Sequence, residues 1–129
     1  MSADYPSMTT AEIRSKFLNF FEERGLKLYP SSSLVPDDPS LLLANAGMNQ
    51  FKEYYQGKKT MKEIGAISCQ KCVRTNDIDC IGEDGRHLSF FEMLGDFSFG
   101  GVSKEQACAW AFELITKEFK LPLDRLYFT

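Results

Sequence analysis

Two apolar runs separated by a polar loop constrain the fold of this chain most. IGAISCQKCVR (64–74) and HLSFFEMLGDFSFG (87–100) have strand composition, while TNDIDCIGEDG (75–85) between them is polar and contains glycine. Strand, loop and strand in succession predict an antiparallel β-hairpin. Gly95 is expected to mark a bulge or a close backbone approach in the second strand.

Two helices are predicted outside the hairpin. Thr9 and Glu12 form a capping box ahead of an apolar stripe, and Gly25 ends the helix. Ser103 and Gln106 begin a second helix, which ends near Phe119. Its expected inner stripe is Ala107, Trp110, Ala111, Leu114 and Ile115.

The remaining segments carry weaker signals. Residues 1–8 are predicted to be a leader. Residues 26–36 predict an edge or irregular strand broken by Pro30 and Pro36, because proline cannot donate to a sheet ladder. LLLANAG (41–47) predicts a buried strand, 49–57 a short helix, and LYFT (126–129) the start of another strand.

Composition places the chain among single-domain globular proteins. It has 129 residues and a formal net charge of −3, so nucleic acid could be attracted only by a local basic patch. The N-terminus lacks the pattern of a secretory signal, and the longest apolar run, 41–44, is too short to cross a membrane. The expected location is therefore cytosolic, with the four cysteines reduced.

Cys69-x-x-Cys72 is the one candidate for a metal site. Cys80 with His87 or Cys108 could complete four zinc ligands, but a strong zinc signature has two closely spaced pairs. Semi-buried free thiols are the simpler interpretation, so we predict no metal here.

Cationic residues gather at the mouth of the predicted hairpin. Arg74 ends the first strand, while Arg86 and His87 open the second and Phe90 and Phe91 follow at once. Cationic donors suit phosphate oxygens, and an aromatic face suits a purine, so the group could hold a nucleotide. The alternative is solvated loop charges paired with nearby acids over a phenylalanine core. No Walker loop, GxGxxG or G-x-S-x-G motif is present.

Four segments carry a family resemblance. MTTAEIRSKFLNFFEERG, SSSLVPDDPSLLLANAGMNQF, CVRTNDIDCIG and RHLSFFEMLGDFSFG, in this order, resemble the N-terminal part of the catalytic domain of alanyl-tRNA synthetases, a class II family. The resemblance runs from about residue 9 to residue 129. It implies an α+β fold, an antiparallel sheet flanked by helices, with motif 1 at about 10–36 and motif 2 at about 67–99.

The resemblance also implies site residues. Arg74 matches the catalytic arginine that binds the α-phosphate of ATP, and Phe91 matches the ring that stacks on adenine. Asn45 and Met48 would lie near the amino-acid pocket. The full set implied to bind ATP is Arg74, Asp79, Arg86, His87, Phe91 and Met93.

The implied reaction is ATP- and Mg²⁺-dependent activation of alanine followed by transfer to tRNA(Ala). Leu88, Ser89 and Asp96 depart from the family's usual residues. The chain is also expected to stop before motif 3, which would leave it incomplete without a C-terminal part and open to self-association through the sheet. The alternative is a non-catalytic paralogue that binds ATP or a protein partner.

Overall fold

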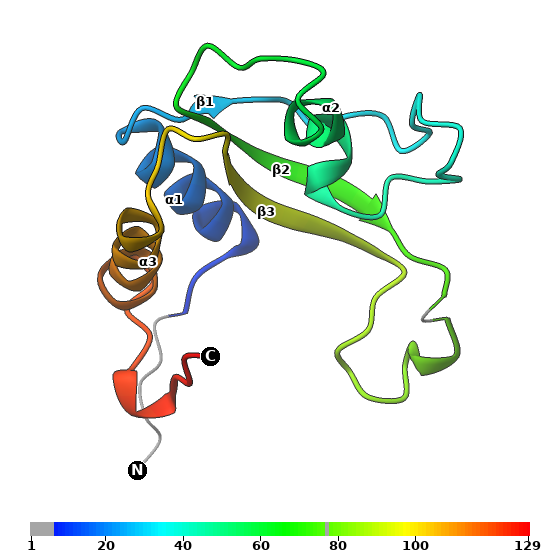
Figure 1. The fold of residues 1–129 in the computed structure, drawn as a ribbon. Coiled ribbons are helices and arrows are strands. Elements are labelled where there is room, and N and C mark those ends of the chain that lie inside the picture. Colours follow the sequence, from blue (N-terminus) through cyan, green and yellow to red (C-terminus); the bar gives the residue numbers. More distant parts are fainter. Residues whose placement is uncertain (1–6, 77) are drawn as a thin grey trace.

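A three-stranded mixed sheet forms the centre of the computed structural model, which describes residues 7–76 and 78–129. The strands are β1 (Lys27–Leu28), β2 (Gly65–Val73) and β3 (Phe90–Ser98), in the order β1-β2-β3 (Figure 1). β2 and β3 are antiparallel, which confirms the predicted hairpin. β1 runs parallel to β2, so the sheet is mixed and the predicted antiparallel arrangement holds only for the β2–β3 pair. A parallel pair needs a long crossover, and residues 29–64 supply it.

Different elements pack on the two faces of the sheet. Paired residues of antiparallel strands point to the same side, so Cys72 and Phe91 share one face with Gln70 and Met93. The helix α1 (Thr10–Glu22) covers the opposite face, where it packs on Ile67. Figure 1 shows α1 and the short helix α2 (Lys52–Tyr55) on opposite sides of the sheet.

The first helix forms as its sequence predicts. The Thr9 hydroxyl accepts the backbone N–H of Glu12 over 3.2 Å, and the Glu12 carboxylate accepts the backbone N–H of Thr9 over 2.7 Å. This is the expected capping box. The apolar stripe supplies half of the main core, whose buried members are Phe17, Phe20, Phe21, Leu26, Ile67 and Leu114.

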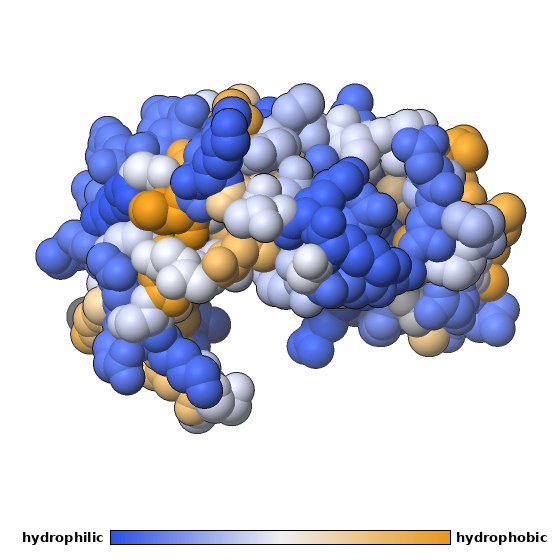
Figure 2. Space-filling model, turned by 45° about the horizontal axis from the view of Figure 1, so that its top comes forward, coloured by the Kyte–Doolittle hydropathy of each residue, from blue (hydrophilic) through white to orange (hydrophobic). Residues whose placement is uncertain are grey.

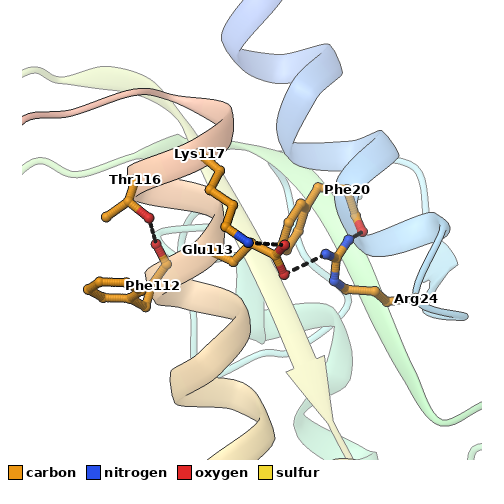
Figure 3. A network of polar contacts seen from close by, with 6 residues as sticks. All are labelled: Phe20, Arg24, Phe112, Glu113, Thr116 and Lys117. Carbon is orange, nitrogen blue, oxygen red and sulfur yellow. Dashed lines mark hydrogen bonds and ion pairs between the residues drawn. The ribbon is translucent and has the colours of Figure 1, made fainter.

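A second helix, α3 (Lys104–Glu113), continues into a π-helical turn (Leu114–Glu118). Its Ser103 cap is confirmed, but the predicted inner stripe holds only in part, since Ala107 and Ala111 are exposed and Leu114 is buried. Arg24 ties α3 to α1 (Figure 3): its guanidinium donates to the Phe20 carbonyl over 2.7 Å and to the Glu113 carboxylate over 2.9 Å. The same guanidinium lowers the pKa of Glu113.

Residues 41–47 do not form the predicted strand. Leu42 is 84% exposed, and the chain passes through turns into a 3₁₀ helix, η1 (Gly47–Phe51), followed by α2. The Ala44 N–H donates to the Leu34 carbonyl over 2.8 Å, so a contact within the loop replaces a strand ladder. The predicted strand at 26–36 contracts to β1, and residues 126–129 form no strand.

The surface is polar over most of the face in Figure 2, with separate apolar patches. Among the described residues, every helix is too short or too polar to cross a bilayer.

Candidate functional site

Arg74 lies directly after β2, at the point where the hairpin opens. Its backbone N–H donates to the Ser89 carbonyl over 3.0 Å, which fixes the base of the loop. Its side-chain Nε donates to the Asn45 carbonyl over 3.1 Å, and its guanidinium carbon lies 5.3 Å from the centroid of the Phe91 ring. Within the described residues, no hydrogen bond uses its two terminal nitrogens. They remain donors for an anion beside an aromatic face.

Met93 lies on the same face as Phe91, two residues further along β3. Its sulfur accepts the Gly47 N–H over 3.3 Å. A second link lies near the end of β2, where the Val73 N–H donates to the Ala44 carbonyl over 2.9 Å. Residues 44–51, which we name the wall segment, thus lie along the face that holds Arg74, Phe91 and Met93.

The two residues predicted for an amino-acid pocket belong to the wall segment. Asn45 is exposed, and its side-chain oxygen accepts the Asn49 amide over 3.1 Å. Met48 is 49% exposed. Both side chains are therefore accessible to solvent.

The loop between β2 and β3 holds the remaining predicted residues. Asp79 is exposed in a short 3₁₀ turn (Ile78–Cys80), and Arg86 and His87 are exposed just before β3. Across the described part of the chain, no hydrogen bond or ion pair joins any of these three to Arg74. The fold therefore brings Arg74 into contact with Phe91 and Asn45, with Met93 on the same sheet face, and shows no such contact to the three loop residues among those described.

Asp84 organises the end of that loop. One carboxylate oxygen accepts the backbone N–H groups of Arg86 and His87 over 2.9 and 3.0 Å, and the other lies 2.6 Å from Nδ1 of His87. These backbone hydrogen bonds, followed by the His87 side chain, lower the pKa of Asp84 to about 2. Asp84 is one of the nearby acids of the alternative interpretation, and its contact with His87 agrees with that interpretation. An Asp-Gly pair ahead of a strand is also a turn signal.

Comparison with known proteins identifies the family. The family model described as "tRNA synthetases class II (A)" matches residues 12–129. The chain belongs to this family. The resemblance inferred from its motifs is confirmed.

Curated relatives of this class II synthetase chain are named alanine–tRNA ligases. The chloroplastic/mitochondrial enzyme of Sorghum bicolor is 56% identical over 115 residues, which cover 89% of this chain and 12% of the relative. The Synechocystis enzyme is 52% identical over 126 residues, or 98% of this chain and 14% of the relative. The Pseudothermotoga lettingae enzyme is 52% identical over 122 residues, or 95% and 14%. The chain thus spans about one eighth of the length of these relatives.

The CxxC pair of this synthetase chain is split between the two sheet faces. Cys69 pairs with Leu94 and Cys72 with Phe91, so the two thiols point in opposite directions. Burial raises the pKa of both. One ion could not bind both sulfurs, and the described residues include no group of three His, Cys, Asp or Glu side chains that could hold a metal.

Gln70 is a residue that sequence reasoning missed. It is fully buried on the Arg74 face of β2, where its amide contacts Ser32 and Gln50. The only sequence signal is a large polar residue at an inward position of β2.

Proposed function

We propose that this chain is the N-terminal part of the catalytic domain of an alanine–tRNA ligase. In the whole protein it would help activate alanine with ATP and transfer it to tRNA(Ala). The observation that carries the proposal is the arrangement of Arg74, whose guanidinium lies against Phe91 with its terminal nitrogens unused among the described residues. The relatives named alanine–tRNA ligase support the choice of alanine.

The ATP site of this proposal is built on the hairpin. Arg74 would donate to the α-phosphate, Phe91 would stack on the adenine, and Met93 would pack beside the base. Arg86 and His87 would reach phosphate oxygens, and Asp79 would lie near the adenine; both roles require the loop to approach ATP. Asn45 and Met48 of the wall segment would line the alanine pocket. The motif boundaries, 10–36 and 67–99, belong to the same proposal.

The chemistry needs no protein nucleophile. The alanine carboxylate attacks the α-phosphorus of ATP, a new P–O bond forms, and the bond to pyrophosphate breaks. Charge builds on the phosphoryl oxygens, where Arg74 would stabilise it. Mg²⁺ would bind phosphate oxygens of ATP, which are the hard ligands that it prefers.

The test is alanine-dependent ATP–pyrophosphate exchange, with Arg74→Ala as the control. Exchange above the Arg74→Ala level would show that this chain activates alanine. ATP binding that Arg74→Ala abolishes, without exchange, would show a nucleotide site that needs the rest of the enzyme. Absence of both signals would contradict the proposal. A cytosolic location stays a prediction.

A further inference from the structure

The amide of Gln70 makes five hydrogen bonds inside the protein. Its oxygen accepts the backbone N–H of Ser32 over 2.9 Å, the Ser32 hydroxyl over 3.0 Å and the Gln50 amide over 3.2 Å. Its nitrogen donates to the backbone carbonyls of Ser32 and Lys71 over 3.2 and 2.8 Å. Both amide protons and both acceptor positions are in use, and the side chain is 0% exposed.

The orientation of this amide is dictated by its partners. A backbone N–H can only donate and a carbonyl can only accept, so Ser32 decides which end of the amide is oxygen and which is nitrogen. A carboxylate of the same shape would lack the donor, and an alkyl side chain would lack both functions. The site therefore requires glutamine for its chemistry as well as its volume.

Where backbone pairing between β1 and β2 ends, hydrogen bonds of the Gln70 side chain continue the contact. β1 pairs with β2 only through Lys27 and Leu28, and the Tyr29 N–H donates to the Ile67 carbonyl over 2.9 Å. The backbone pairing ends there, and the Lys71 N–H donates instead to the Ser31 hydroxyl over 3.1 Å. Beyond this point the contact continues through side chains, with Gln70 bound to Ser32 and Gln50 bound to the Pro30 carbonyl over 3.3 Å.

The same side chain faces the candidate site. Its register partner is Met93, whose sulfur accepts the Gly47 N–H, and a Cβ added to Gly47 would lie 3.6 Å from the Gln70 Cβ. Arg74 therefore holds the wall segment at Asn45, and Gln70 holds it at Gln50. Met48, with its exposed side chain, lies between the two attachments.

We propose that Gln70 is a positioning residue for the amino-acid side of the site. It fixes the Met48–Gln50 part of the wall segment against β2 and so sets the shape of the pocket beside the reacting carboxylate. The nucleotide side depends on Arg74 and Phe91, which Gln70 does not contact through any hydrogen bond among the described residues. This inference rests on the proposed function.

The test compares two ligands by calorimetry on the chain. The first is ATP with Mg²⁺; the second is 5′-O-(N-alanylsulfamoyl)adenosine, a stable analogue of alanyl-adenylate. Gln70→Leu should weaken binding of the analogue about tenfold, which is the equivalent of roughly one lost hydrogen bond. It should change the affinity for ATP less than about twofold. Gln70→Glu keeps the acceptor and loses the donor, so it should fall between Gln70→Leu and wild type.

Two further variants separate positioning from folding. Ser68→Ala is the matched control, since Ser68 is equally buried on the same face of β2 and its hydroxyl has no partner among the described residues. Ser68→Ala should leave the affinity for both ligands unchanged. Gln50→Leu breaks one bond to Gln70 without altering β2, and should weaken the analogue about threefold. If Gln70→Leu does not fold, Gln50→Leu still tests the inference.

The outcomes are distinguishable. Selective loss of the analogue in the Gln70 and Gln50 variants supports the inference. Variants whose affinity falls equally for both ligands, or for neither, overturn the inference. In that case ATP binding by the wild-type chain still supports the nucleotide site. If the wild-type chain binds neither ligand, the proposed function is wrong and the inference falls with it.

Discussion

The Nε of Arg74 donates to the backbone carbonyl of Asn45 over 3.1 Å. This one contact joins the end of β2 to the wall segment and aims the guanidinium. One edge of the fork is held by the carbonyl, and the guanidinium carbon lies 5.3 Å from the centroid of the Phe91 ring. The remaining edge is left to face a ligand.

Arg74→Lys should therefore fail to replace arginine. Lysine keeps the positive charge but loses the Nε contact and the guanidinium beside the Phe91 ring, so we expect ATP binding to weaken about tenfold. Arg74→Ala, which also loses the charge, should weaken it further. Titration with ATP and Mg²⁺ measures the affinity of both variants. Lys71→Ala is the matched control, because Lys71 is exposed on the opposite face of β2; equal affinity in Arg74→Lys and wild type would contradict the prediction.

Gly95→Ala should destabilise the hairpin. β2 and β3 stay in register at Ser68 and Gly95, so the predicted bulge is absent, and the group close to residue 95 is the Phe97 ring rather than the predicted backbone. A Cβ at residue 95 would lie 2.6 Å from Cζ of Phe97, well inside van der Waals contact. Because overpacking of this kind typically costs about 1–3 kcal/mol, urea unfolding should show a loss of that size.

A double-mutant cycle checks the cause of that loss. In a Phe97→Leu background the ring is gone, and Gly95→Ala should cost less than about 1 kcal/mol. An undiminished cost would show that backbone conformation at residue 95, rather than the ring, disfavours alanine.

Local signals explain which elements the sequence predicts. The capping box at Thr9 and the cap at Ser103 need only neighbouring residues, and both helices form where they indicate. The hairpin needs only two strands and a polar loop. The hairpin in turn places Arg74 near Phe91, so that part of the candidate site is predictable from alternation and chain reversal alone.

Long-range contacts determine the elements and site contacts that local signals do not predict. The apolar run 41–47 satisfies strand composition, but Ala44 bonds to Leu34 and Val73 instead of entering a ladder. The parallel placement of β1 depends on a crossover of more than thirty residues, and the role of Gln70 depends on Ser32 and Gln50 reaching it. None of these partners can be identified from the local pattern.

β3 is one of the two edge strands of the described sheet, and self-association through the sheet stays a prediction. Phe90 at the start of β3 is 52% exposed, and an uncovered edge strand can pair with another copy. We expect sedimentation velocity to show a concentration-dependent average mass that Phe90→Lys reduces. A monomer at every concentration would contradict the prediction.

The Asp84 carboxylate should stay ionised well below the usual range. Its pKa is about 2 in the folded chain, against about 3.9 for an ordinary aspartate. Because the folded value is the lower one, the contribution of Asp84 to stability is present above about pH 4 and is lost as the pH falls from about 4 toward 2. At pH 3 an ordinary aspartate would be roughly 90% protonated, whereas Asp84 would be roughly 90% ionised.

Amide NMR of Arg86 and His87 measures this directly, since both N–H groups donate to the Asp84 carboxylate. Their chemical shifts should change little between pH 5 and pH 3 and begin to move only below pH 3. Asp84→Asn keeps a side-chain oxygen as acceptor but cannot titrate, so the same amides should show no transition at all. A midpoint near 4 in the wild-type chain would mean that Asp84 does not hold these two amides in solution, and the turn before β3 would then depend on other contacts.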